Sequence, residues 1–420
     1  MNPFELKPKK QSELLIDWEK MWAKPYEKHT VDPYTRTRVI LMNGTEFENV
    51  WFSHLNMRNI ENNDLRRAVA LIRRSEQQQQ KLLAHLKPGN ETALEHTIGY
   101  EQLAVDLTAH LAKRVSDGNL KAALDFALLE DFDHLYRYAD YMDLIEKEKA
   151  EKLVGGYTEI MPGRPTISHH RHPYDSIRYP MTNPNPELMD VLAANVITAA
   201  EQQTMNYYMN TAALWPEEIG RRLYQEIGMV EEQHVSHYGS LLNPRLTFLE
   251  NLLVHQYTEC WLYLSAMETE TNAHIRKIWE FMFETELMHL NIARELLETY
   301  EKKTWNQVLP QGEFPAPLKL ESNIEYVRDV LGSTVYNTAL RENYVDVCSL
   351  KDHDTFFDYQ KQVNEPVHNV TSHMVIEKYI SENCRDYRYE LAPNPVCELR
   401  DRSNDNTEVG RVSEKVLEKV

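Results

Sequence analysis

Residues 231–242, EEQHVSHYGSLL, carry the spacing on which the fold prediction rests. Glu231 stands three residues before His234, and in a helix this spacing places both side chains on one face. Residues 199–208, AAEQQTMNYY, carry Glu201 in a second helical pattern, 30 residues before Glu231. A turn near the middle of that interval would bring both acids to about the same height on two antiparallel helices. The pattern therefore predicts a helical hairpin with a polar level inside it.

Two further hairpins repeat this arrangement, each with one acid on its first helix and an acid-x-x-His pair on its second. They contain Glu101 with Asp131 and His134, and Glu259 with Glu286 and His289. The paired acids are 30 and 27 residues apart. The acid-x-x-His spacing alone is expected by chance in a chain with 65 acidic residues and 17 histidines. Its occurrence inside long helices, each time with a partner acid at matching height, is what makes the pattern informative.

These acids fall within apolar stripes. The same-face neighbours of Glu101 include Leu94, Ile98 and Val105. An unpaired ionised carboxylate in such surroundings costs several kcal/mol or takes up a proton. A divalent metal ion removes that cost by supplying compensating charge and coordination. A metal-free interior with buried Glu–His hydrogen bonds is the alternative interpretation.

The stretches 199–208 and 231–242 resemble the second hairpin of the ferritin-like di-iron or di-manganese carboxylate superfamily. This superfamily includes rubrerythrins, ribonucleotide reductase small subunits, bacterial monooxygenases and manganese catalases, and the resemblance covers roughly residues 90 to 300. It implies an all-α protein with a ferritin-like helical bundle, here six or more long helices in three hairpins with N- and C-terminal extensions. It also implies two iron ions as cofactor, or manganese, or a mixed Mn/Fe pair, held by four carboxylates and two imidazoles.

In the superfamily the two acid-x-x-His helices run antiparallel, and a long connection separates the two hairpins. Residues 151–185, rich in Gly, Pro and His, can serve as that crossover between the first and second hairpins. The metal ligands are therefore predicted to be Glu101, Asp131, His134, Glu201, Glu231 and His234. Asp131 stands where the family has Glu. The third hairpin, with Glu259, Glu286 and His289, remains a reserve set that could replace either partner.

Tyrosines accompany the proposed ligands. Tyr138, Tyr208 and Tyr238 each stand seven residues after a proposed acid. In ribonucleotide reductase small subunits, a tyrosine one turn past the histidine holds a radical, and Tyr138 and Tyr238 fit that position. The favoured interpretation is that these tyrosines fill the core and hydrogen-bond a ligand carboxylate. No catalytic side chain is assigned beyond the metal ligands.

The sequence predicts four segments. Residues 1–60 are interpreted as an N-terminal arm, in which Arg38–Met42 before Asn43-Gly44 forms one leg of a small hairpin. Residues 61–302 form the ferritin-like domain, with seven long helices between 64 and 302. Residues 303–399 form a smaller helical extension, and 400–420 a mobile tail.

The bulk composition excludes several partners. The net charge of −19, without a concentrated Lys/Arg run, argues against binding nucleic acid or an anionic membrane surface. The N-terminus MNPFELKPKK lacks the apolar core of a signal peptide, and the four cysteines form no CxxC pair. A reducing cytoplasm is the predicted location.

Three functions remain open. The first is an O2-activating oxygenase or oxidase acting on a small organic substrate, with an electron-donor protein as a further candidate partner and a homodimer as one candidate assembly. The second is peroxide detoxification, as in rubrerythrin or manganese catalase, although rubrerythrins usually add an iron site of paired cysteines. The third is non-enzymatic iron handling or a helical interaction module.

Overall fold

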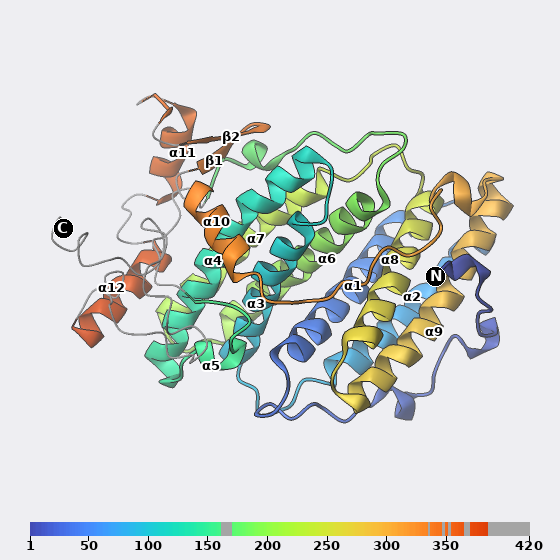
Figure 1. The fold of residues 1–420 in the computed structure, drawn as a ribbon, viewed down its shortest axis with the longest axis horizontal. Coiled ribbons are helices and arrows are strands. Elements are labelled where there is room, and N and C mark those ends of the chain that lie inside the picture. Colours follow the sequence, from blue (N-terminus) through green and yellow to red (C-terminus); the bar gives the residue numbers. More distant parts are fainter. Residues whose placement is uncertain (161–169, 335–336, 347–348, 352–353, 365–369, 385–420) are drawn as a thin grey trace. The chain divides into compact units, whose positions relative to one another are not determined.

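The computed structural model describes residues 1–160, 170–334, 337–346, 349–351, 354–364 and 370–384. Its longer helices are α1 (Pro33–Met57), α2 (Asn63–Ala84), α3 (Ala93–Ala112), α4 (Gly118–Glu146), α6 (Leu188–Thr211), α7 (Glu218–Gly239), α8 (Phe248–Thr269) and α9 (Ala273–Leu296). The shorter elements are α5 (Glu151–Val154), α10 (Ile324–Thr334), α11 (Thr355–Asn364), α12 (Thr371–Asn383), and the strands β1 (Asn337–Leu340) and β2 (Asn343–Asp346). The all-α class is confirmed, with helices packed as antiparallel hairpins (Figure 1).

Local sequence signals explain where these helices begin. Thr92 accepts a hydrogen bond from the backbone N–H of Glu95, whose side chain bonds back to Thr92, and Thr247 and Glu250 form the same capping box before α8. Asp117, with its carboxylate on two backbone N–H groups, caps α4. The seven helices predicted between 64 and 302 are all present, as α2 to α4 and α6 to α9.

The hairpin leg predicted at Arg38–Met42 is wrong, because these residues lie inside α1. Asp32 caps this helix and Pro33 occupies its first turn. The Asn43-Gly44 pair, which suggested a turn, instead fits against α6: a Cβ on Gly44 would lie 3.1 Å from Gln203 Cβ. Asn43 Oδ1 also accepts a hydrogen bond from Gln203 Nε2 at 3.1 Å. The glycine is therefore explained by a close helix–helix approach.

The chain forms two compact units, each built from three separate segments. Unit 1 comprises Met1–Glu91, Pro180–Gln203 and Leu242–Lys319. Unit 2 comprises Thr92–Tyr179, Thr204–Leu241 and Leu320–Val420. The chain passes from one unit to the other within α6, after Gln203. The predicted boundaries at residues 60, 302 and 399 stay a prediction.

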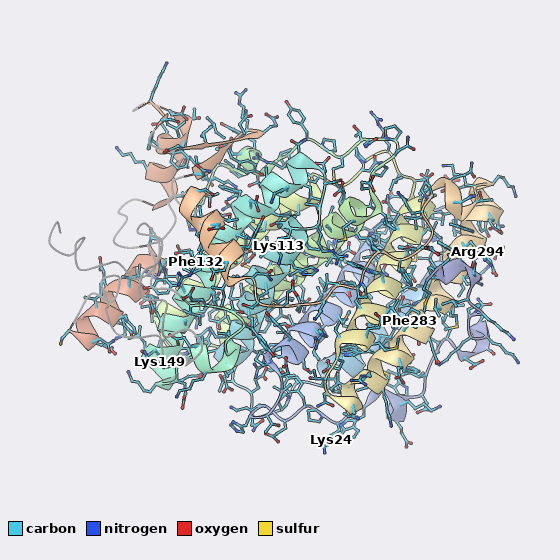
Figure 2. All side chains as sticks on the ribbon, viewed as in Figure 1. Lys24, Lys113, Phe132, Lys149, Phe283 and Arg294 are labelled. Atoms are coloured by element: carbon cyan, nitrogen blue, oxygen red, sulfur yellow. The ribbon has the colours of Figure 1, made fainter. Side chains whose placement is uncertain are left out.

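Unit 1 contains a four-helix arrangement. The hairpin of α1 and α2 lies beside the hairpin of α8 and α9, with α1 against α8 and α2 against α9 (Figure 1). Phe283 of α9 is one of its buried residues (Figure 2).

In unit 2, α3 pairs with α4, and α4 also packs against α7 and α10 (Figure 1). The end of α6 returns into α7, and Tyr208 of α6 contacts Tyr224 of α7, with ring centroids 5.7 Å apart. The described part of the predicted crossover 151–185 contains α5 and a short 3-10 turn at Pro173–Ser176. An antiparallel β1–β2 ribbon in the C-terminal extension was not predicted. The predicted tail 400–420 lies outside the described residues.

None of the described helices is both long and apolar enough to cross a lipid bilayer.

Candidate metal centre

The first ligand group lies in unit 2, on α3, α4 and α7. Ligand atoms of Glu101, His134 and Glu231 all lie within 4.8 Å of one another. The three side chains are buried, at 0, 0 and 1 % exposure. His134 Nδ1 lies 2.8 Å from Glu231 Oε1, so these two residues meet across two different hairpins.

A second group contains two further predicted ligands of unit 2. Asp131 and His234 are buried, as is Glu201, which belongs to unit 1. His234 Nδ1 is 3.4 Å from Asp131 Oδ1 and 3.0 Å from Glu231 Oε2. Five of the six predicted residues therefore lie together as two buried carboxylate–histidine groups in unit 2, and Glu201 as a ligand stays a prediction.

Glu231 connects the two groups. Its Oε1 faces Nδ1 of His134 and its Oε2 faces Nδ1 of His234. The two imidazole rings lie 5.8 Å apart between centroids. A carboxylate with one oxygen toward each imidazole stands where a bridging ligand between two metal ions would stand.

The electrostatic surroundings of His134 favour the neutral form of its imidazole. Burial, followed by the neighbouring His234, lowers the pKa of His134 well below its usual range. His134 is therefore neutral near pH 7, and neutral imidazole is the form that binds a metal. Four ionised carboxylates carry four negative charges, which two divalent ions would neutralise. The donor set, rich in oxygen with two imidazole nitrogens, fits iron or manganese.

Sequence reasoning missed a supporting pair, Glu130 and Arg171. Glu130 Oε2 lies 2.9 Å from His234 Nε2, so it holds the ring with Nδ1 directed toward Asp131 and Glu231. Arg171 Nη1 donates to both oxygens of Glu130 at 2.7 Å, and both side chains are buried. Glu130 directly precedes Asp131, but no sequence pattern links it to an arginine 41 residues away.

Arg171 comes from the predicted crossover. Its Nε donates to Ser176 Oγ at 3.2 Å, which ties the 170–178 stretch together. The neighbouring His170 lies 3.4 Å from Glu226 of α7. The described residues 170–178 of the crossover therefore contact α4 and α7, the helices that carry predicted ligands. Arg171 from this stretch holds Glu130, which in turn contacts His234.

The tyrosine prediction is confirmed for Tyr208, whose hydroxyl donates a hydrogen bond to Glu101 Oε1. Tyr208 packs against Tyr138 and Tyr224, with ring centroids 5.1 and 5.7 Å away. Burial raises the pKa of all three phenols well above the usual value, so they stay protonated. Tyr238 lies beside His234, with ring centroids 6.3 Å apart.

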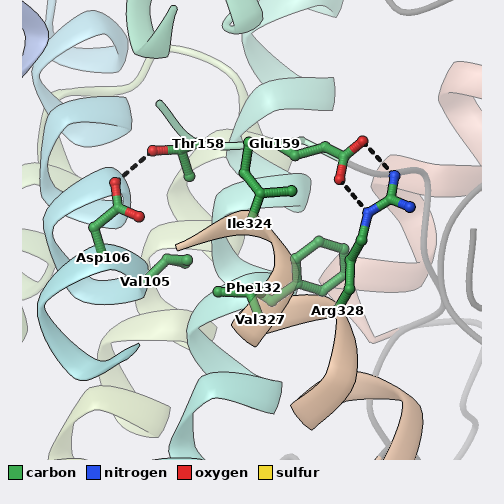
Figure 3. Close-up of a pocket in the computed structure, with 8 residues that line it drawn as sticks. All are labelled: Val105, Asp106, Phe132, Thr158, Glu159, Ile324, Val327 and Arg328. Atoms are coloured by element: carbon green, nitrogen blue, oxygen red, sulfur yellow. Dashed lines mark hydrogen bonds and ion pairs between the residues drawn. The ribbon is translucent and has the colours of Figure 1, made fainter. Parts of the chain in front are cut away.

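A small pocket lies on another face of α3 and α4 (Figure 3). Its walls come from Val105, Asp106, Phe132, Thr158, Glu159, Ile324, Val327 and Arg328. Thr158 donates to Asp106 at 2.6 Å, and Arg328 forms a two-bond ion pair with Glu159 at 2.7 Å (Figure 3). None of the six predicted ligands is among its lining residues.

The reserve set is not part of either group. Glu259, Glu286 and His289 belong to unit 1, where their acidic neighbours are Glu46 of α1 and Glu76 of α2. The hairpin of α1 and α2 was not recognised from the sequence, because position 79, three residues after Glu76, is Gln and not His. The 30-residue interval from Glu46 to Glu76 was the available signal.

In comparisons with known proteins, no family model, no curated protein sequence and no solved structure matches this chain.

Proposed function

We propose that this chain is a divergent ferritin-like protein and an O2-activating oxidoreductase with a dinuclear iron centre. The observation that carries the proposal is the placement of Glu231 between His134 and His234. Two carboxylate–histidine groups joined by a shared carboxylate suit a metal pair better than two separate ions.

The six residues divide the ligand roles. Glu231 would hold both metals, with Glu101 and His134 as further ligands of one and Asp131 and His234 as further ligands of the other, and Glu201 is proposed as the sixth ligand. Asp131 is one methylene shorter than Glu, and Thr108 Oγ1 donates to its Oδ2 at 3.1 Å, which fixes the direction of the carboxylate. Two ferrous ions, when bound, supply two electrons to O2.

The surrounding residues control protons and water. Glu130 accepts the Nε2 proton of His234, and Tyr208 keeps its phenolic proton while donating to Glu101. The ligands are at most 1 % exposed, so bulk water is excluded from the reacting atoms. A dry interior protects a reactive oxidant from side reactions, which supports oxygen chemistry over open iron exchange. The proposal includes a small organic substrate, and an electron-donor protein to reduce the metals between turnovers.

Anaerobic loading of the metal-free protein with Fe(II), followed by a measured pulse of O2, tests this function. The expected result is uptake of about one O2 for each iron pair, with oxidation of both ferrous ions. A Glu231→Gln variant should lose this coupled uptake. Rapid consumption of H2O2 with no response to O2 would overturn the proposal and favour peroxide chemistry.

A further inference from the structure

Unit 1 repeats the hairpin arrangement of the metal centre. Its acids are Glu46 on α1, Glu76 on α2, Glu259 on α8 and Glu286 on α9, and the two hairpins have intervals of 30 and 27 residues between acids. With His289, they form what we call the unit 1 cluster. Of the four hairpins in the chain, three have 30 residues between their paired acids and one has 27. Such similar intervals place the four acids of unit 1 at about one level of its four-helix arrangement.

The α9 motif has the same local geometry as its counterpart on α7. His289 Nδ1 lies 3.1 Å from each oxygen of Glu286, just as His234 Nδ1 lies 3.0 Å from Glu231. On α2, however, Gln79 occupies the position of the second histidine and donates to Glu286 Oε1 at 2.7 Å. The cluster therefore has one imidazole where the unit 2 site has two.

Neighbouring amide and phenol groups donate hydrogen bonds to the other three acids of the cluster. Asn49 Nδ2 donates to Glu76 Oε1 at 2.9 Å and to Glu259 Oε2 at 2.5 Å. Gln256 Nε2 donates to the same two oxygens at 2.9 and 3.1 Å. Tyr263 donates to Glu46 Oε1 at 2.5 Å. These bonds satisfy one oxygen of each of three carboxylates.

The other ligand atoms of these side chains are not satisfied in this way. Glu46 Oε2, Glu76 Oε2, Glu259 Oε1 and His289 Nε2 are buried and have no hydrogen-bond partner among the residues that the structure describes. The side chains that carry them are at most 3 % exposed. Buried polar atoms are almost always satisfied by protein, water or an ion, so several in one cluster indicate a missing partner.

The charges point to a cation as that partner. Burial and the neighbouring acids raise the pKa of Glu46 and Glu259 well above the usual range, and burial raises that of Glu76 to about 7. The pKa of His289 is raised by Glu286 despite its burial. Four acids beside one imidazole carry a negative charge when ionised, which a divalent ion or protons must balance.

We propose that the unit 1 cluster is a second metal site, which binds one divalent ion of the manganese or iron class. Glu286 and His289 supply the chelating pair, and Glu46, Glu76 and Glu259 supply further oxygen ligands. One imidazole among carboxylates suits a hard to borderline ion. The site is independent of the proposed oxidoreductase activity.

The two sites should differ in affinity. Among the described residues, no group of three ligand atoms within 4.8 Å comes from the unit 1 cluster, whereas Glu101, His134 and Glu231 of unit 2 form such a group, so the unit 1 ligands lie further apart. A metal there must draw the acids together and displace the amide bonds from Asn49 and Gln256. Unit 2 therefore fills first, and the unit 1 ion binds more weakly.

Titration of the metal-free full chain with Mn(II), followed by the electron paramagnetic resonance signal of free Mn(II), tests the proposal. About three ions should bind per chain, two tightly and one more weakly. A Glu231→Gln, His234→Gln double variant should keep the weaker, mononuclear ion. His289→Gln should lose that ion and keep the tight pair, whereas Glu284→Gln, an exposed acid on the same helix, is the matched control and should change nothing.

Gln79→His gives a gain-of-function test that does not depend on damaging the fold. It completes a second acid-x-x-His motif opposite Glu286 and His289, so we expect about four ions per chain. Binding of only two ions by the unaltered chain, with no change in Gln79→His or His289→Gln, would overturn the proposal and leave protons as the balancing charge. That result would leave the dinuclear site in unit 2 untouched.

Discussion

His134 Nδ1 lies 2.8 Å from Glu231 Oε1, although the two residues belong to different helical hairpins. The other oxygen of the same carboxylate lies 3.0 Å from His234 Nδ1. One side chain on α7 thus links the histidines of α4 and α7.

Glu231→Gln should remove both metal ions from unit 2, because an amide is a poor bridging ligand. Glu101→Gln should remove only one, because Glu101 belongs to a single group. Metal content after dialysis against a weak chelator measures the difference. Glu232→Gln is the control: its carboxylate accepts from Ser236 Oγ at 2.8 Å, so binding should be unchanged. Equal metal loss in the Glu101 and Glu231 variants would contradict a bridging role.

His134→Ala should lower the unit 2 metal content to at most one ion. His289→Ala should leave the dinuclear pair intact, because His289 lies in unit 1. The optical spectrum of the iron-loaded protein after exposure to O2 separates the two variants. A dinuclear spectrum that survives in His134→Ala but disappears in His289→Ala would contradict the proposed site. It would show that the dinuclear centre uses the hairpin of α8 and α9 instead of the hairpin of α3 and α4.

Glu130→Gln should weaken metal binding at His234 by about 10- to 100-fold, the usual effect of losing a group that orients a ligand. The change also leaves Arg171 without its carboxylate, so stability should fall by several kcal/mol. Isothermal titration with Mn(II) and urea unfolding measure the two effects separately.

Asp133→Asn is the matched control for Glu130→Gln. Asp133 forms a similar buried ion pair, with Arg137 at 2.8 Å on the same helix, and it is not one of the predicted ligands. It should lose stability and keep its metal affinity. Equal affinity losses in both variants would mean that Glu130 acts only through the fold.

His110 should make the protein less stable in mild acid. Burial, and then Arg114, lowers its pKa from 6.5 to about 4 in the folded state. Below pH 6.5 the unfolded chain therefore binds a proton that the folded chain does not, and stability falls as the pH drops toward 4. The loss is at most about 3.5 kcal/mol, from about 1.4 kcal/mol per pKa unit. His110→Gln should be less sensitive over this interval in urea unfolding at pH 7 and pH 4.5. An identical pH dependence in both proteins would refute this role.

The helices and the ligand types were predictable because their signals are local. Capping residues such as Thr92 and Asp117 define helix starts within three residues, and the i,i+3 spacing of Glu231 and His234 fixes a common face. The length and direction of the 151–185 connection also paired the first hairpin with the second, and Glu101, His134 and Glu231 of these two hairpins lie together in the structure.

Only the tertiary structure decided how the four hairpins are shared between the two units. Residues 33–57, interpreted as part of an arm, form α1 and pack with α2, α8 and α9, so the third hairpin has its own partners. The sequence alone could not show whether Gly44 marks a turn or lies inside a helix. The reason for a glycine at this position is the close approach of Gln203, which is far away in the chain. The contact of Glu130 with Arg171 could not be predicted from the sequence either. Such contacts depend on long-range packing, which joins residues whose separation in the chain carries no periodic signal.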